Sequence, residues 1–238
     1  MVAVLASAVF FKGSWAEKFD PAATAPGHFA DVDGTKNSVP MMHRMGSMAA
    51  SGQVAALGGA AAVRLDYGEK REGPGGGGHD YAALFVLPEQ PGAAGLASAV
   101  RALSLASAGT LLQQLEKRKV RLSMPKVKAS YGVASLKPAL RSLGLATAFD
   151  GRGVFAAMSD DPEVHISDVV TKAVLEIDEE GTVAAAAAAV IMMTRGIKRE
   201  PPPLELEFDR PFLMAVLHVP SGTPLFLSVI HEPGGTFR

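Results

Sequence analysis

The segment from residue 179 to 203 has the residue types and spacing in this chain that most suggest chemistry. It opens with the acidic, glycine-marked run Glu179-Glu180-Gly181-Thr182-Val183 and continues with six alanines, Ala184, Ala185, Ala186, Ala187, Ala188 and Ala189. Further on, Arg195-Gly196 precedes a proline-rich exit. The long cation of Arg195 suits the carboxylate in the specificity pocket of a trypsin-like protease, and Gly196 leaves the far side of the bond unobstructed. The segment could therefore present a cleavable bond to a protease.

The same residues are also compatible with a helix, because alanine is the best helix former. Asp178 or Thr182 could cap an alanine-rich helix from Val183 to Met193. An isolated helix of this length is marginal in water. Gly181 and Thr182 fit a hinge as well as a helix start, so the motifs on either side have to decide.

Composition limits the classes of protein and partner. The chain has 238 residues, of which 48% are hydrophobic and 20% charged, so one domain with a substantial core is expected over residues 1–238. A formal net charge of −1 argues against nucleic acid or an anionic membrane as the main partner. There are no cysteines, which excludes disulfides and thiolate metal sites.

Other candidate sites are weak. The six histidines are scattered without metal-ligand spacing, and Asp160, Asp161 and Glu163 lack the alternation and glycine of a calcium loop. No serine lies in a nucleophile elbow. We therefore expect no metal, no cofactor and no enzymatic activity. A solvated helix end and strand face account for the basic residues Lys117, Arg118, Lys119, Arg121, Lys126 and Lys128, so polyanion binding is not expected.

The residues near the amino end, Val2 to Phe11, are almost wholly apolar. They lack the positive region of a secretory signal and fall short of the ~20 residues that cross a bilayer, so we expect a buried strand.

The rest of the chain alternates between strand-like and helical patterns, which predicts a mixed, strand-rich α+β fold. Ala93–Leu115 is expected as an interrupted helix and Ser135–Leu140 as a short helix followed by Gly144. Strands are expected at Val39–Met42, Ala62–Tyr67, Tyr81–Leu87, Val120–Met124, Val169–Ile177, Leu204–Phe208, Phe212–Leu217 and Pro224–Ile230.

Several motifs resemble those of the serpin family, and they occur in serpin order over essentially the whole chain. They are Phe10-Phe11-Lys12-Gly13-Ser14-Trp15, Val39-Pro40-Met41-Met42, Leu84-Phe85-Val86-Leu87-Pro88, Leu122-Ser123-Met124-Pro125-Lys126, the hinge from Glu176 to Ala189, Asp209-Arg210-Pro211-Phe212 and Pro224-Leu225-Phe226. The arginine after Met192-Met193 resembles plant serpins most.

The resemblance implies the carboxyl-terminal part of a serpin fold, with a large and a small sheet and without the family's amino-terminal helices. It implies a serine protease inhibitor that acts as a suicide substrate: a trypsin-like protease forms an acyl ester at Arg195, and the cleaved loop inserts into a sheet. Thr182, Ala184, Ala186 and Ala188 would then face one side of the new strand.

The resemblance also assigns the region where the sheet opens to Ser7, Trp15 and Thr171. Ser7 and Thr171 replace the usual asparagine and histidine there, and Val183 replaces an acidic hinge residue. A truncated, non-inhibitory relative is the alternative function. Family resemblance favours an extracellular location, and the weak signal sequence leaves a cytoplasmic one open.

Overall fold

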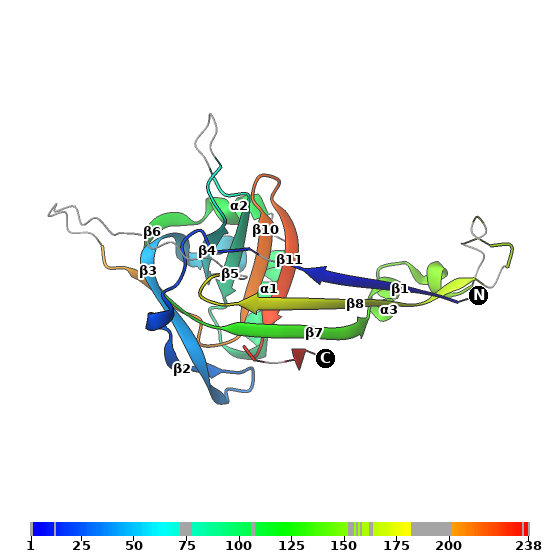
Figure 1. Ribbon diagram of the computed structural model, residues 1–238, viewed down its shortest axis with the longest axis horizontal. Coiled ribbons are helices and arrows are strands. Elements are labelled where there is room, and N and C mark those ends of the chain that lie inside the picture. The colour runs from blue at the N-terminus through cyan, green and yellow to red at the C-terminus, as the bar shows by residue number, and fades with distance from the viewer. Residues whose placement is uncertain are drawn as a thin grey trace. The chain divides into compact units, whose positions relative to one another are not determined.

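The computed structural model describes residues 2–11, 13–71, 78–105, 108–151, 155, 157, 159–161, 164–181, 201–234 and 236–237. This part of the chain is rich in strands and has few helices (Figure 1). It divides into two compact units. The larger unit comprises residues 12–127 and 176–233, and the smaller one comprises residues 1–11, 128–175 and 234–238.

The larger unit is built on an eight-stranded sheet with the order β11-β10-β5-β4-β3-β6-β9, and β2 pairs with β3 outside that path. Within the described residues its strands pair in antiparallel fashion, except β6 with β9, which are parallel. The strands are β2 (Ala25–Ala30), β3 (Lys36–Val54), β4 (Ala60–Tyr67), β5 (Tyr81–Leu87), β6 (Glu116–Pro125), β9 (Leu204–Glu207), β10 (Phe212–His218) and β11 (Thr223–Ile230).

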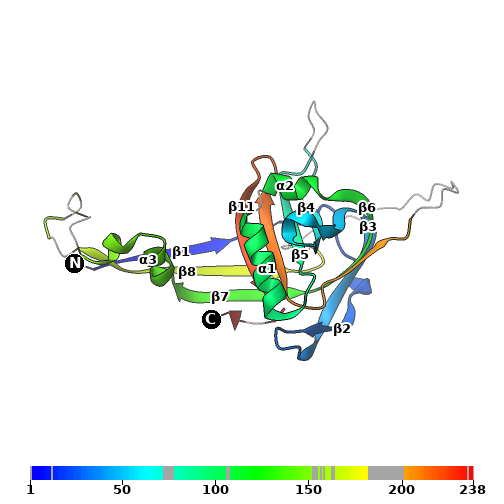
Figure 2. The same cartoon turned by 180° about the vertical axis from the view of Figure 1, so that it is seen from behind.

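Strands β5 and β10 read as continuous apolar runs because both of their faces are covered. On one face, Leu84 and Leu213 pack in a cluster with Leu96 of α1 (Gly92–Leu105) and Leu111 of α2 (Ala108–Gln113). Figure 2 shows α1 lying across the strands of this sheet. On the other face, alternate residues such as Phe85 join an aromatic cluster with Phe208 and Phe212.

The smaller unit is built on a four-stranded sheet with the order β1-β8-β7-β12. Its elements are β1 (Val2–Phe10), β7 (Val127–Ser135), α3 (Lys137–Ser142), β8 (His165–Ile177) and β12 (Thr236–Phe237). Strands β1 and β8 run parallel and are directly paired. Strand β1 lies at the edge of the sheet, where the side chains of Val4 and Leu5 are 62% and 50% exposed.

The strand-rich α+β class predicted from the sequence is confirmed. The predicted strands at Ala62–Tyr67 and Tyr81–Leu87 coincide with β4 and β5 to within two residues. Val39–Met42 is a strand as predicted, but it forms part of the longer, 19-residue strand β3. The placement of Lys117–Lys119 at a helix end was wrong, because these residues lie within β6. The expected strand at Val2–Phe11 is β1, but it is not buried along its length, because Val4 and Leu5 are exposed. The prediction of one domain over 1–238 stays a prediction.

Within the described residues, no helix is long and apolar enough to cross a membrane. The same part of the chain holds no cluster of three or more side chains suited to a metal ion.

Candidate functional site

Strand β8 ends at the buried Ile177 and runs into a closed turn, Asp178–Gly181. The backbone groups of Asp178 and Gly181 exchange two hydrogen bonds of 3.3 Å. Inside the turn, the Asp178 Oδ1 atom accepts a hydrogen bond of 3.0 Å from the Glu180 N–H. A short acceptor side chain at the first position is the usual way to stabilise such a turn. The turn therefore fixes the backbone at the start of the segment that the sequence singles out.

Gly181 is required at the end of this turn for two reasons. Its φ angle is +108°, in a region that residues with a Cβ atom rarely adopt. A Cβ atom at this position would also lie 2.5 Å from both the Gly13 oxygen and the Trp15 nitrogen, which are backbone atoms. The turn is thus pressed against the chain around Trp15 so closely that only glycine fits.

Trp15 holds the turn from the other side. Its backbone N–H donates to the Glu180 oxygen at 2.9 Å, and its indole Nε1–H donates to the Asp178 oxygen at 3.0 Å. The indole ring is buried and stacks on Tyr67 with ring centroids 4.4 Å apart. Burial raises the pKa of Tyr67, so its hydroxyl stays neutral and supports an uncharged packing surface. Trp15 therefore lies buried and fixes the turn Asp178–Gly181 in place.

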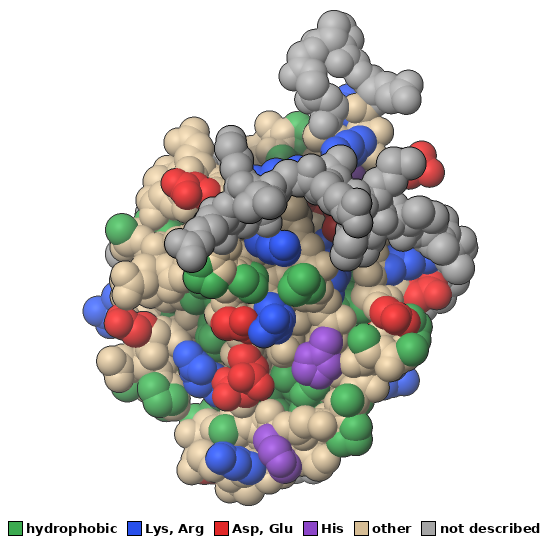
Figure 3. Space-filling model, turned by 90° about the vertical axis from the view of Figure 1, so that its left-hand side faces the viewer, with side chains coloured by type: hydrophobic (Ala, Val, Ile, Leu, Met, Phe, Trp, Pro, Cys, Tyr) green, Lys and Arg blue, Asp and Glu red, His purple; other side chains and the backbone are tan. Residues whose placement is uncertain are grey.

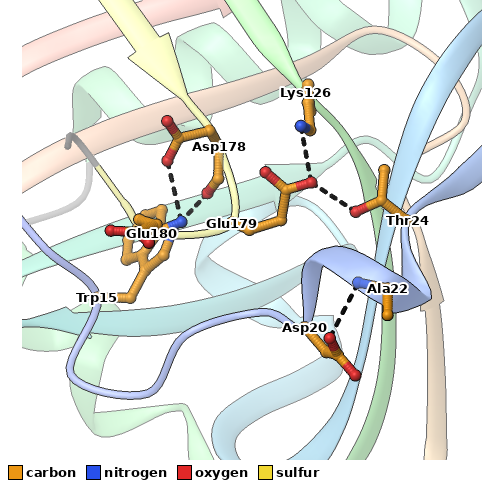
Figure 4. A network of polar contacts seen from close by, with 8 residues as sticks. All are labelled: Trp15, Asp20, Ala22, Thr24, Lys126, Asp178, Glu179 and Glu180. Atoms are coloured by element: carbon orange, nitrogen blue, oxygen red, sulfur yellow. Dashed lines mark hydrogen bonds and ion pairs between the residues drawn. The ribbon is translucent and has the colours of Figure 1, made fainter. Parts of the chain in front are cut away.

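Glu179 points from the turn into the larger unit and is only 6% exposed (Figure 4). Its Oε1 atom accepts a hydrogen bond of 2.6 Å from the Thr24 hydroxyl and pairs with the Lys126 Nζ atom at 2.7 Å. Its backbone oxygen accepts from the Phe19 N–H at 2.9 Å. Burial by itself would raise the pKa of Glu179, but hydrogen bonds from Lys126 and Thr24 and the lysine charge outweigh it and lower the pKa. Glu179 is therefore a buried, ionised anchor.

Glu180 is held much less firmly than its neighbour. Its carboxylate lies 3.6 Å from the Lys18 Nζ atom, and its side chain is 38% exposed. The Glu180 Oε2 and Lys18 Nζ atoms make no hydrogen bond within the described residues. The two adjacent residues therefore stabilise the turn differently. Glu179 fixes it through its side chain, whereas Glu180 contributes mainly its backbone oxygen, which accepts from the Trp15 N–H.

The structure brings some of the predicted site residues together. Glu180 and Gly181 lie in the turn and contact Trp15, while Thr182, Val183, the alanines from 184 to 189, Arg195 and Gly196 lie outside the described residues. Ser7 and Thr171 are direct partners in the parallel pairing of β1 with β8. They belong to the smaller unit, whereas Trp15 belongs to the larger one.

Sequence analysis missed the anchor formed by Glu179, Thr24 and Lys126. Glu179 was noted only as part of an acidic hinge, and Lys126 was grouped with surface cations. Thr24 lies 155 residues from Glu179 in the sequence, so only the fold brings the two together. The available signal was the position of Glu179 directly after an apolar strand, where a buried carboxylate needs a cation.

The sequence is similar to known proteins over most of its length. The sequence profile described as "Serpin (serine protease inhibitor)" matches residues 1–233. Iripin-5 from Ixodes ricinus is 34% identical over 230 residues, which cover 94% of this chain and 53% of the relative. Serpin-Z2B from Triticum aestivum is 32% identical over 234 residues, covering 94% of this chain and 54% of the relative. The chain thus spans about half the length of the curated relatives it matches.

Solved structures agree in fold. The structure of human thyroxine-binding globulin has a TM-score of 0.72 and 26% identity, with 96% of this chain and 56% of that one covered. The native state of the thermophilic serpin tengpin has a TM-score of 0.75 and 23% identity, covering 96% of this chain and 55% of that one. With a profile match over nearly all of its residues and several serpin relatives above 30% identity, this chain belongs to the serpin family.

Proposed function

We propose that the protein inhibits a trypsin-like serine protease as a suicide substrate, with residues 179–203 as its reactive loop and Arg195-Gly196 as the reactive bond. The observation that carries the proposal is the anchored turn Asp178–Gly181. It holds the start of this segment at the end of β8, and the chain next enters a described strand at β9, which begins at Leu204. Described strands thus flank the segment on both sides, which suits a loop that presents a cleavable bond.

The proposed chemistry needs one bond to form and one to break. The protease serine Oγ attacks the Arg195 carbonyl carbon, and its proton passes to the protease histidine. The Arg195–Gly196 peptide bond then breaks, and the Gly196 amine leaves with that proton. The product is an acyl ester between the protease and Arg195. Inhibition requires that this ester escape hydrolysis.

Strand insertion is the step that would protect the ester. The site for it lies between β1 and β8, which are paired directly from Val2 with His165 to Phe10 with Val174. Opening this pair would break its backbone hydrogen bonds, and a new central strand would restore them on both sides. The small side chains of Ala184, Ala186 and Ala188 would enter one face of the sheet without displacing core residues.

A non-inhibitory relative is the second candidate, and the exposed edge of the smaller sheet favours it. Val4 and Leu5 on the edge strand β1 are at least half exposed. An uncovered apolar edge favours association with another polypeptide. If the edge of the smaller sheet stays exposed, strand insertion need not release enough free energy to hold a protease as an acyl ester.

Mixing the purified chain with trypsin separates the two candidates. The inhibitor proposal expects a covalent chain–trypsin complex that survives boiling in detergent. Arg195→Ala should abolish that complex, while Arg199→Ala, a matched change four positions away in the same segment, should leave it intact. Cleavage after Arg195 without a complex would support the non-inhibitory relative. Loss of the complex in Arg199→Ala but not in Arg195→Ala would refute the assigned bond.

A further inference from the structure

A second cluster of charged side chains surrounds a cavity of about 270 Å³ in the larger unit. Its lining includes Glu17, Arg44, Arg64, Asp66, Lys70 and Lys117. Four of these residues are cations and two are carboxylates, so the cavity carries a formal surplus of two positive charges. None of these residues belongs to the proposed reactive bond or to the Glu179 anchor.

The register of the sheet explains how the cavity forms. Ala49 of β3 lies opposite Arg64 of β4 on one side and opposite Lys117 of β6 on the other. The three residues therefore form one row, with a methyl group between two long cations. Neighbouring strands lie about 4.8 Å apart, so the backbones of Arg64 and Lys117 are about 10 Å apart. The short side chains of Ala49 and Ser47 leave space between the longer ones, and both residues line the cavity.

The two arginines are held in place by carboxylates that use only part of their donor capacity. Arg44 donates to the backbone oxygen and the Oε2 atom of Glu17, the latter at 2.6 Å, and its guanidinium lies over the Phe19 ring. Arg64 donates through Nε to Asp66 Oδ1 at 2.6 Å. A guanidinium has five N–H donors, so its remaining donors can bind a further acceptor. The arginines are thus oriented in advance for an anion.

The other two cations have no carboxylate of their own. Within the described residues, neither Lys70 nor Lys117 forms an ion pair, and both side chains are exposed. The Arg44 side chain is only 12% exposed, and this burial lowers its pKa although Glu17 opposes the shift. A partly dehydrated cation beside unpaired lysines gains most from an added negative charge.

We propose that this cavity binds a compact, multiply charged oxyanion, namely a phosphate or sulfate group, through Arg64, Lys70 and Lys117. Arg121 lies four residues beyond Lys117 on β6 and is already paired with Glu205 at 2.8 Å. The unpaired positive charge beside the cavity therefore does not continue to Arg121. Figure 3 shows one face of the molecule, on which acidic and basic side chains lie side by side among the coloured residues. A compact anion therefore fits better than a long polymer.

Calorimetric titration of the full chain tests the proposal, with inorganic pyrophosphate and a sulfated heparin disaccharide as separate probes. Binding of either probe with one site per chain is expected. Binding of pyrophosphate identifies phosphate as the ligand group, and binding of the disaccharide identifies sulfate. Lys117→Ala and Lys70→Ala should each raise Kd about tenfold, which corresponds to one charge-assisted contact.

Arg118→Ala is the matched control, because Arg118 is adjacent on β6 and exposed but does not line the cavity. It removes the same charge, and its Kd should change less than about twofold when salt at about 0.15 M screens distant charges. Equal weakening in Lys117→Ala and Arg118→Ala would mean general surface attraction and would overturn the proposal. Saturable binding of neither probe would overturn it as well. Both outcomes are independent of whether the chain inhibits a protease.

Discussion

Replacing Glu179 with glutamine tests whether the buried carboxylate anchors the hinge. The change keeps the shape of the side chain but removes its charge, so the contact of 2.7 Å with Lys126 loses its ionic character. Hydrogen bonds to a charged group contribute about 1.5–3 kcal/mol. Because Lys126 is 39% exposed and partly screened, we expect the lower part of that range, about 1.5–2 kcal/mol.

Thermal unfolding followed by circular dichroism measures this loss. For a chain of this size each kcal/mol shifts Tm by about 2–4 °C, so Glu179→Gln should lower Tm by about 3–8 °C. Glu180→Gln is the matched control at the adjacent position. Its contact with Lys18 is 3.6 Å long and makes no hydrogen bond within the described residues, so losing it should cost less than about 0.5 kcal/mol. An equal or larger loss in Glu180→Gln would refute the assignment of Glu179 as the anchor.

The pH dependence of the same pair of proteins gives a second check. Hydrogen bonds and the lysine charge lower the pKa of Glu179 below its unfolded value despite burial. The stabilisation is therefore complete above the unfolded pKa, about 4.3, and is lost as the pH falls through the folded pKa. The difference in stability between the wild type and Glu179→Gln should stay constant from pH 7 to about 5 and shrink below about 4. A difference that grows on acidification would contradict this reasoning.

Three further changes probe the hinge and the loop. Gly181→Ala should lower the free energy of unfolding by at least about 2 kcal/mol in urea titrations, because the turn needs φ of +108° and has no room for a Cβ atom. Trp15→Phe keeps an aromatic ring on Tyr67 but removes the donor to the Asp178 oxygen; we expect a loss of about 1 kcal/mol in the same assay, since Gly181 N–H still reaches that oxygen. Ala184→Arg should raise the number of inhibitor molecules consumed per trypsin inactivated, and an unchanged number would exclude insertion of that face.

Local sequence patterns were sufficient to predict the bounds of the buried strands β5 and β10, but not those of the longest strand, β3. The apolar runs of β5 and β10 can only be buried on both faces, so their bounds were predictable. Strand β3 contains Pro40, Gly46 and Gly52, which normally mark strand ends. It persists for 19 residues because it pairs in turn with β2, β6 and β4, and no short window of sequence contains those partners.

The candidate site likewise contains one feature that local sequence reveals and one that depends on distant residues. Gly181 was recognisable because glycine has a local conformational role. The importance of Glu179 arises from Thr24, just before β2, and Lys126, just after β6, and a single sequence carries no sign of that proximity.

The anchor also determines where movement of the proposed loop can begin. Four contacts hold the chain up to Glu180: the contacts of the Glu179 carboxylate, the bond of 2.9 Å from the Phe19 N–H to the Glu179 oxygen, the bond of 2.9 Å from the Trp15 N–H to the Glu180 oxygen and the bond of 3.0 Å from the Trp15 indole to the Asp178 oxygen. The two bonds that close the turn at Gly181 are 3.3 Å long, beyond the usual range for strong backbone hydrogen bonds. An incoming strand would therefore have to open the weak end of the turn and could leave the strong end intact. If residues beyond Gly181 join the smaller sheet as proposed, Gly181 is the pivot and Glu179 is the fixed point about which they turn.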